Sequence, residues 1–352
     1  QQGTDGQLLT STGSGIAWED APATLTFKTF GTDSIMIGDT TTGTINNANK
    51  NVGLGVNVFE SLTTGDNNVA VGYDTLSSLT TQGGNVAIGY QAGKSVVSGY
   101  ENVFIGLYSG INAVHREAIA IGSYSMYSNV GTTSGDIGIG MGAMQYKNAS
   151  LGNTIAIGTS AHRGSSNTTG RSNIAIGPYA MNAITTGTFN TAVGDSALTG
   201  ITTGTYNVAI GPSALYANTT ASYNTAIGRD SLKANITGAQ NTALGYQAGL
   251  ASTNEGNTFI GYHAGKTTTG YQNTLIGDQI NAGSISANNQ NGLGHAITCA
   301  AGFTMSFDPI TITISVSGKS SLISSISSTI SYGTLASANK TFMWPGNRPA
   351  TG

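Results

Sequence analysis

Charged side chains are scarce in this sequence. Asp, Glu, Lys and Arg together make up 8% of the 352 residues, against roughly 25% in an average soluble domain. A lone globular chain with so few charges would be poorly soluble, so we expect partner chains to cover much of its surface. The formal net charge of −3 provides neither a basic face for nucleic acid nor a polybasic patch for a membrane surface.

Cysteine and long apolar runs are scarce as well. The single cysteine, Cys299, excludes an internal disulfide framework. No run of about 18 apolar residues occurs that could span a bilayer, so we expect no membrane insertion. The four histidines show no spacing typical of a metal site, and we expect neither a metal nor a cofactor.

Glycine, in contrast, is abundant, and much of it is periodic. The 51 glycines are about twice the usual share, and sixteen of them close a recurring element of the form N-[VT]-A-[IV]-G. Nine of the fifteen intervals between these marker glycines equal the one from Gly194 to Gly211, and the other six differ from it by no more than two positions. The marker glycines are Gly38, Gly55, Gly72, Gly89, Gly106, Gly122, Gly140, Gly158, Gly177, Gly194, Gly211, Gly228, Gly245, Gly261, Gly277 and Gly294.

A repeat period of about 17 residues is too short for a helical hairpin, a propeller blade or a βαβ unit. It suits one coil of a parallel β-solenoid, in which each turn consists of short strands joined by tight bends. Sixteen coils at an interstrand spacing of about 4.8 Å would form a rod on the order of 75 Å long. The repeat therefore predicts an all-β, rod-shaped fold.

The three residues that precede each marker glycine predict which side chains face the interior of a coil. The residue directly before the glycine is always apolar, and the residue two places earlier is Val or Thr in most copies, so we expect both to face the coil interior. The residue between them is small in twelve of the sixteen copies, and we expect it to face outward against an identical chain, as in a homotrimer. These trimer-interface candidates are Ala70, Ala87, Ala120, Ala156, Ala175, Ala192, Ala209, Ala226 and Ala243.

Polar and aromatic residues also recur at fixed places. Asparagine stands four residues before the marker glycine in eleven copies, and stacked asparagines can form a hydrogen-bonded ladder. A polar TTG bend recurs, for example at Thr202–Gly204. Phe189, Tyr206 and Tyr223 lie one repeat period apart and should stack as an aromatic column.

The elements NVAIGYQAG (Asn85–Gly93) and NTALGYQAG (Asn241–Gly249) resemble the head repeats of trimeric autotransporter adhesins. The resemblance covers about residues 33–296 and implies a left-handed β-roll wound as an intertwined homotrimer. The coil here is longer than the adhesin repeat. In addition, GTDGQLLTSTGSGIAW (Gly3–Trp18) is similar to a segment common in phage tail-fibre proteins. Together the two resemblances favour a virion fibre over a cell-wall adhesin.

The chain divides into three parts. Residues 1–32 form a lead-in, and residues 33–296 form the solenoid, whose coils between Gly106 and Gly177 mostly carry extra loop residues. From about residue 297 the repeat stops. Because ITITISVS (Ile310–Ser317) alternates strictly, residues 297–352 predict a small C-terminal β module. This module would cap the open solenoid end or form the tip of the fibre.

The sequence contains few signs of catalysis. The sixteen acidic residues are scattered, whereas a glycosidase needs two carboxyl groups roughly 5–10 Å apart across a groove. The positions one coil away from Asp195 are Pro178 and Pro212, not acids. We therefore expect no enzyme activity.

Aromatic and basic residues gather in the longer middle coils. Tyrosines beside charged groups are typical of carbohydrate-binding sites, because a sugar ring packs on an aromatic face. The alternative explanation is that these loops are polar only because they are longer. The candidate receptor-binding residues are Tyr124, Tyr127, Tyr146, Arg163 and, near the terminus, Trp344.

These observations favour a structural and adhesive fibre protein of a virion, a phage tail fibre whose rigid trimeric shaft presents a host-receptor-binding end. Its partners would be two further copies of itself, other tail proteins of the virion and a host glycan or protein receptor. The alternative is a trimeric adhesin on a bacterial cell surface. A polysaccharide depolymerase and an ice-binding solenoid rank lower, the latter because the threonine column Thr225–Thr274 is expected to face the core.

Overall fold

The computed structural model describes most of the chain up to Leu293. The described residues are 7–12, 15–20, 26–28, 34–38, 47–112, 115–129, 133–147, 152–165, 168–282, 286 and 288–293. The expected C-terminal module (residues 297–352), with Trp344 and Cys299, lies outside them.

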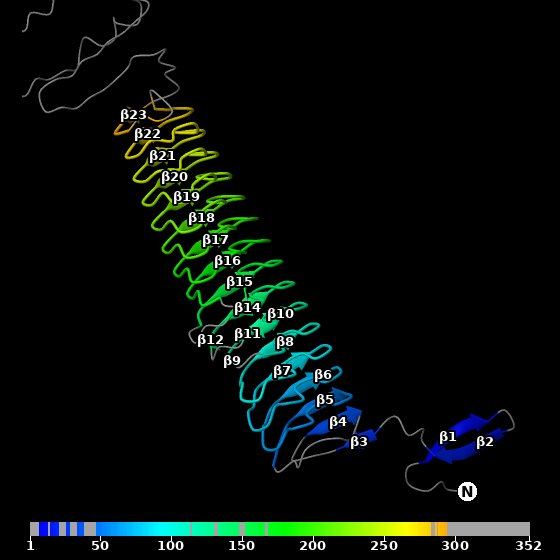
Figure 1. The fold of residues 1–352 in the computed structure, drawn as a ribbon. Coiled ribbons are helices and arrows are strands. Elements are labelled where there is room, and N and C mark those ends of the chain that lie inside the picture. Colours follow the sequence, from blue (N-terminus) through cyan, green and yellow to red (C-terminus); the bar gives the residue numbers. More distant parts are fainter. Residues whose placement is uncertain are drawn as a thin grey trace, which may run out of the picture.

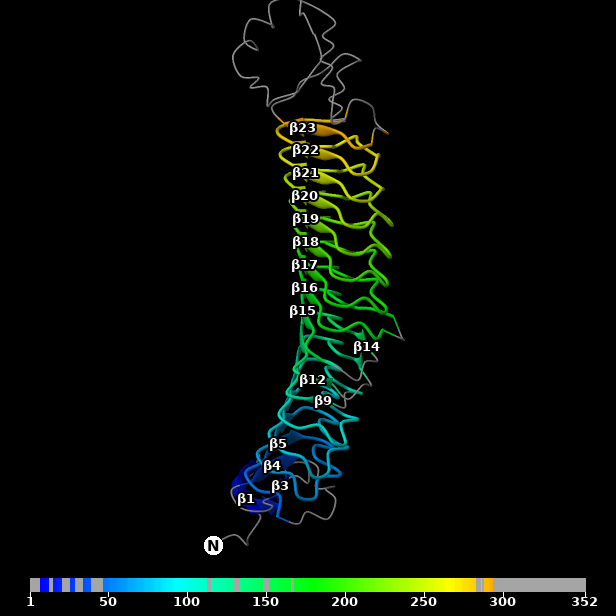
Figure 2. The same cartoon turned by 90° about the vertical axis from the view of Figure 1, so that its left-hand side faces the viewer.

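The main body is a parallel β-solenoid, seen as a rod of stacked coils in Figure 1 and, turned by 90°, in Figure 2. Each coil contributes one short strand to a single continuous sheet, and the described residues contain no α-helix. The stacked strands are β4 (Ile35–Gly38), β5 (Val52–Gly55), β6 (Val69–Val71), β7 (Val86–Ile88), β8 (Val103–Ile105), β10 (Ile119–Ile121), β13 (Ile137–Ile139), β15 (Ile155–Ile157), β16 (Ile174–Ile176), β17 (Thr191–Val193), β18 (Val208–Ile210), β19 (Thr225–Ile227), β20 (Thr242–Leu244), β21 (Thr258–Ile260), β22 (Thr274–Ile276) and β23 (Asn291–Leu293).

The register of the sheet repeats from coil to coil. Ala175 pairs with Ala192, and Ala192 pairs with Ala209. The marker glycines thus located the strands and their spacing correctly, and the predicted β-solenoid is confirmed. The left-handed sense and the trimer remain predictions.

Seven further strands lie outside this parallel stack. β1 (Gln7–Thr12) and β2 (Gly15–Asp20) form an antiparallel hairpin, and β3 (Thr26–Lys28) pairs antiparallel with β4. In the longer middle coils, β9 (His115–Arg116) pairs with β12 (Thr133–Ser134), and β11 (Ser128–Asn129) pairs with β14 (Tyr146–Lys147). The extra residues of these coils therefore build two short secondary sheets.

The facing of the strands is opposite to the sequence-based expectation. All nine alanines that were expected at a trimer interface are fully buried inside the single chain and belong to its hydrophobic core. The flanking residues, for example Val208 and Ile210, point outward, and Ile210 is 39% exposed. The assignment of Ala70, Ala87, Ala120, Ala156, Ala175, Ala192, Ala209, Ala226 and Ala243 to an interface between chains is therefore wrong.

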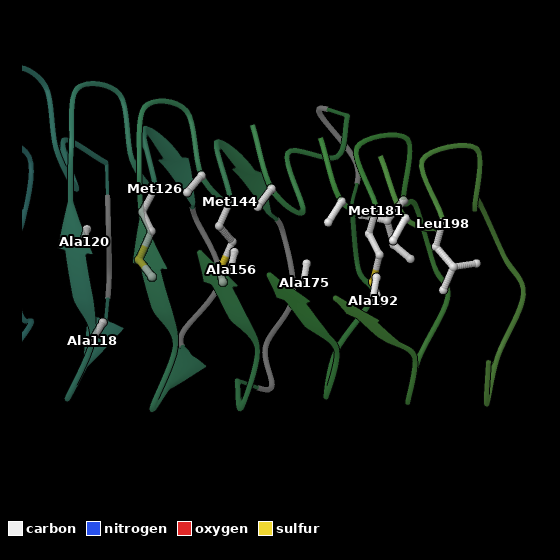
Figure 3. Close-up of a cluster of buried hydrophobic side chains, with 14 of the residues drawn as sticks. Ala118, Ala120, Met126, Met144, Ala156, Ala175, Met181, Ala192 and Leu198 are labelled. Atoms are coloured by element: carbon white, nitrogen blue, oxygen red, sulfur yellow. The ribbon is translucent and has the colours of Figure 1, made fainter. Parts of the chain in front are cut away.

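The alanines fit inside because larger side chains reach them from the opposite wall of the coil. Figure 3 shows this layering: Ala156 and Ala175 point inward from the strands, and Met144, Met181 and Leu198 point toward them from across the coil. Between the strand and the wall that faces it, a coil has room for one large residue, such as Leu198 in the coil of Ala192. The small residue on the strand is thus the interior one, and the branched residues beside it face solvent.

Two layers reverse this division of volume. Phe104 and Phe259 stand where other coils have alanine, and both are fully buried. Two glycines face each ring, Gly93 and Gly110 at Phe104 and Gly249 and Gly265 at Phe259, and a Cβ at any of the four would overlap the ring. Side-chain size is therefore exchanged between the two walls, which keeps the core close-packed.

The turns depend on backbone conformations with positive φ. The marker glycines have φ values near +130°, as at Gly211 (+126°), and a Cβ there would collide with the backbone of the next marker glycine. Beyond the strand, buried leucines such as Leu215 (φ 50°) and Leu232 (φ 48°) adopt the left-handed region, which costs a non-glycine residue of the order of 1 kcal/mol.

The predicted asparagine ladder runs through the core. Asn207 Nδ2 donates to Asn190 Oδ1 at 3.0 Å, and Asn224 Nδ2 donates to Asn207 Oδ1 at 3.2 Å. The same amide groups also bind backbone atoms, for example the bond from Asn207 Nδ2 to the Ala221 carbonyl at 2.8 Å. The ladder provides hydrogen-bond partners for the backbone N–H and C=O groups at the corner where the chain enters each strand.

Candidate functional site

The strand face that points away from the core forms an aliphatic surface along the rod. We call it the outer wall: the first and third residues of each strand from β5 to β22. Its exposed members include Val52, Leu54, Ile88, Ile174, Ile176, Ile210 and Leu244. The wall consists of Val, Ile and Leu up to β16, and from β17 onward Thr joins them in most strands.

The size of the outer wall exceeds what monomers usually expose. The strands from β5 to β22 span on the order of 70 Å at about 4.8 Å each, and a three-residue strand is about 10 Å long, giving an area of order 700 Å². The largest apolar patch on a typical monomer is about 300–600 Å². A stable interface buries about 800 Å² per partner.

A second surface feature is a run of five tyrosines, which we call the tyrosine run. Tyr73 and Tyr90 stack with ring centroids 5.3 Å apart, and Tyr90 meets Tyr108 edge-on at 5.3 Å. Tyr108 then contacts Tyr124 at 5.2 Å and Tyr127 at 6.1 Å. The run follows the rod axis and ends in the longer middle coils.

The tyrosine run contains two of the candidate receptor-binding residues and extends beyond them. Tyr124 and Tyr127 lie together, with ring centroids 5.4 Å apart. The sequence-based candidates did not include Tyr73 and Tyr90, although both directly follow a marker glycine and lie one repeat period apart. That spacing was the signal that could have identified them.

The other pair of candidates also comes together. The Arg163 guanidinium lies over the Tyr146 ring, with Cζ 5.7 Å from the ring centroid, and Arg163 Nε donates to Gln145 Oε1 at 2.9 Å. Tyr146 pairs with Ser128 in the short β11–β14 sheet, and Ser128 directly follows Tyr127. The two pairs therefore occupy adjacent coils. Trp344 lies outside the described residues.

The aromatic column of Phe189, Tyr206 and Tyr223 is confirmed. The rings are 5.1 and 5.3 Å apart and nearly parallel, with interplanar angles of 8° and 4°. Because neighbouring rings cover one another's faces, this column presents mainly ring edges and hydroxyl groups to solvent. A flat platform for a sugar ring is available only where the packing is edge-on or tilted, as between Tyr108 and Tyr127.

Beneath Tyr146, the core contains an ion pair. Lys147 follows Tyr146 on β14 but points inward, and its Nζ lies 2.8 Å from Asp136 Oδ1, with both side chains fully buried. Lys147 Nζ also donates to Asp136 Oδ2 at 2.9 Å and to Thr154 Oγ1 at 3.2 Å. Burial lowers the pKa of the Lys147 ammonium, while the contact with Asp136 opposes that shift.

The ion pair interrupts the asparagine ladder. Asp136 and Thr154 occupy two successive ladder positions, and Asn173 resumes the ladder in the next coil. His162, fully buried, lies with Nε2 3.2 Å from Asn173 Nδ2. Burial and then the positive charge of Lys147 lower the pKa of His162 from 6.5 to about 4, so the imidazole is neutral at pH 7.

The acidic turn residues are held by lysines. Asp74 Oδ2 lies 2.7 Å from Lys94 Nζ, and Asp230 Oδ1 lies 2.9 Å from Lys233 Nζ. Burial raises the pKa of Asp74, but hydrogen bonds from Lys94, Asn57 and Gln91 outweigh it and lower that pKa overall. These carboxylates stabilise turns.

The described residues contain neither a metal cluster nor a membrane-spanning helix. No three His, Cys, Asp or Glu side chains come together there in a way that could hold a metal ion. In the same part of the chain, no helix has the length and apolar character needed to cross a membrane. No protein-family model, curated protein or solved structure matches this chain.

Proposed function

We propose that this chain is a structural and adhesive fibre protein, a rigid homotrimeric shaft that presents a receptor-binding region. The proposal places it in a virion, as a phage tail fibre attached to other tail proteins. The observation that carries it is the outer wall. A mostly aliphatic face of order 700 Å², with a threonine in most strands from β17 onward, is larger than the apolar patch of a typical soluble monomer, and identical copies around a threefold axis would cover it most simply.

The composition supports the same proposal. A chain with 8% charged residues has little repulsion between copies, and solvation by charged groups is weak over most of its length. Burial of the outer wall would leave the tyrosine run and the polar turns as the solvent-facing surface. The resemblance of the repeat to trimeric adhesin heads is a second, sequence-based support.

The oligomeric state is tested by light scattering on the full chain, with two matched variants. Ile210 and Tyr216 belong to the same coil and are similarly exposed, at 39% and 43%, but only Ile210 lies on the outer wall. We expect three times 35.6 kDa for the wild type and for Tyr216→Lys, and a lower mass for Ile210→Lys. A monomeric wild type, or an equal effect of both variants, would contradict the trimer.

The receptor-binding region is proposed to be the middle of the shaft, at Tyr124, Tyr127, Tyr146 and Arg163. Tyrosines with an adjacent guanidinium suit a carbohydrate that carries acidic groups. The test is binding of the full chain to a panel of bacterial surface polysaccharides and whole cells. Tyr124→Ala with Tyr127→Ala should abolish binding, and Tyr206→Ala should not. Binding that survives the first variant would move the receptor site elsewhere.

The alternative setting is a bacterial cell surface, as a trimeric adhesin with the same shaft. The parent gene separates the two settings, because an adhesin would carry a C-terminal membrane-anchor barrel and a tail fibre a tail-attachment domain. Release of reducing ends from host capsule would instead favour a depolymerase.

One observation favours a second candidate function, ice binding. The threonine column of Thr225, Thr242, Thr258 and Thr274 was expected to face the core, but these residues lie on the outer wall and Thr242 is exposed. A row of outward threonines provides half of the flat, exposed T-x-T array that an ice-binding solenoid needs, since the third residue of these strands is Ile or Leu. A monomer in light scattering that also shows thermal hysteresis in dilute solution would favour this function over the fibre.

A further inference from the structure

The buried ion pair of Asp136 and Lys147 has no part in the proposed shaft or receptor surface. Both side chains have no exposure to solvent. Removing two ions from water carries a desolvation penalty of several kcal/mol per ion, which their mutual attraction often fails to offset. Other coils place an asparagine at the position of Asp136 and leucine, isoleucine or asparagine at that of Lys147, as at Asn190 and Ile201. The pair therefore replaces a neutral arrangement that the same fold uses elsewhere.

The ion pair holds the amine nitrogen and the carboxyl carbon within reach of one another. Lys147 Nζ is 2.8 Å from Oδ1 and 2.9 Å from Oδ2 of Asp136. Because the carboxyl carbon lies between its two oxygens, Nζ is within about 3.3 Å of Asp136 Cγ, inside the range of roughly 3–3.5 Å for a near-attack arrangement. Rotation of the carboxyl group about its Cβ–Cγ bond would turn the face of Cγ toward Nζ.

Thr154 contributes two groups to the same site. Its backbone N–H donates to Asp136 Oδ1 at 3.0 Å, which is where negative charge would develop if Cγ were attacked. Its hydroxyl oxygen accepts a hydrogen bond from Lys147 Nζ at 3.2 Å, which helps to hold the nitrogen beside the carboxyl group. Burial also lowers the pKa of Lys147, which favours the nucleophilic amine over the ammonium.

We propose that Asp136 and Lys147 condense to form an intramolecular isopeptide bond. A proton first passes from Nζ to Oδ2, leaving a neutral amine and a carboxylic acid. Nζ then attacks Cγ, and the negative charge that develops on Oδ1 is stabilised by the Thr154 N–H. A second proton passes from Nζ directly to Oδ2, which lies 2.9 Å away in the ion pair, and Oδ2 departs as water. The Nζ–Cγ bond forms, the Cγ–Oδ2 bond breaks, and nothing is oxidised or reduced.

The product matches its surroundings better than the ion pair does. An amide at Asp136 restores the functional group that asparagine supplies in the rest of the ladder. Its carbonyl oxygen still accepts the Thr154 N–H, and its remaining N–H still reaches Thr154 Oγ1. Two buried charges disappear, so the desolvation penalty disappears with them, and the water released has no reason to return to a closed apolar core. The bond would tie β14, which carries Tyr146, to Asp136 directly before strand β13 of the main sheet, whatever the oligomeric state.

The test is the intact mass of the full chain measured under denaturing conditions, with trypsin digestion as a second readout. The wild type should be lighter than its sequence mass by about 18 Da, the mass of one water. Trypsin should fail to cleave after Lys147, leaving residues 117–163 as one peptide that has lost the same mass. Lys147→Arg, which keeps the charge but cannot form the bond, should regain the missing mass whether or not it folds.

Two results would overturn the proposal. A wild type with its full sequence mass and normal cleavage after Lys147 would mean that the pair is an ion pair only. A loss of about 18 Da that persists in Lys147→Arg would place the lost water elsewhere in the chain.

Discussion

The packing of the core can be tested by moving the large side chain of one coil from its strand to the wall that faces the strand. Phe259 fills the space that Leu or Met occupies in other coils, and two glycines face its ring, Gly265 in the same coil and Gly249 in the coil before. Phe259→Ala should cost about 3–5 kcal/mol, because the cavity left by a phenyl ring relaxes only in part. Gly265→Leu should also destabilise, by about 1–2 kcal/mol for its left-handed backbone and about 1–3 kcal/mol for overpacking against the ring.

The double variant should be far better than the sum of its parts. It places alanine on the strand and leucine opposite, the arrangement of Ala226 and Leu232, where leucine tolerates φ 48°. We expect a favourable coupling of at least about 2 kcal/mol in the double-mutant cycle. The assay is amide hydrogen exchange of residues 258–276, since local openings in a repeat array need not report global unfolding.

The matched control is the same cycle at Phe104 and Gly110, which have the same geometry. If the free-energy changes of the two single variants add up to that of the double variant within about 0.5 kcal/mol at both sites, the two side chains do not compete for the same volume. That result would refute this account of the core.

Three further predictions concern polar groups in the core. Asn218 is fully buried and its amide has no hydrogen-bond partner among the described residues, so Asn218→Ile, which copies Ile201 in the previous coil, should raise the stability to denaturant by about 1–3 kcal/mol, and a lowered midpoint would contradict this. Asn207→Ala removes the ladder bonds to its neighbours and should lower the stability by about 3 kcal/mol or more, measured in the same way; an effect below about 1 kcal/mol would mean that the ladder is not a stabilising element. His162 has its pKa lowered from 6.5 to about 4, so its contribution to stability is present above pH 6.5 and is lost as the pH falls from 6.5 toward 4, by about 3 kcal/mol in all. His162→Leu should flatten the slope of unfolding free energy in that window, and an unchanged slope would show that other groups cause it.

The length of the repeat and the stacking of side chains from coil to coil could be predicted from the sequence, because each depends on one residue type that recurs at one position of the repeat. The marker glycines located the strands, the asparagines before them predicted the ladder, and the spacing of Phe189, Tyr206 and Tyr223 predicted their column. In each case, residues one coil apart must be neighbours once the register is constant, so no knowledge of the coil's cross-section was needed.

The facing of the strands could not be predicted in the same way. Alternation separates Ala209 from Val208 and Ile210 but does not say which face is inside, and the larger residues were taken as the interior ones. What decides the matter is the opposite wall, where Leu215 already fills the layer. Phe104 and Phe259, each facing a glycine, were the residues from which this could have been inferred.

The buried ion pair lay beyond reach for another reason. Asp136 and Lys147 are 11 residues apart, which is not a whole coil, and they meet across the interior of a coil with added loop residues. Their contact depends on the shape of one particular turn. The sequence repeat therefore gave no information about this ion pair, which involves residues of one coil alone.

In the described part of the chain, each strand of the parallel stack from β5 to β22 contacts only the strand before it and the strand after it, in the same register. Removal of one whole coil, such as residues 195–211, would therefore join two surfaces that already match, and insertion of a copied coil would do the same. The rod would change by about 4.8 Å each time. The length of the rod is thus set by the number of coils. Duplication or deletion of one short stretch of the gene can change that number while the contacts between neighbouring coils stay the same.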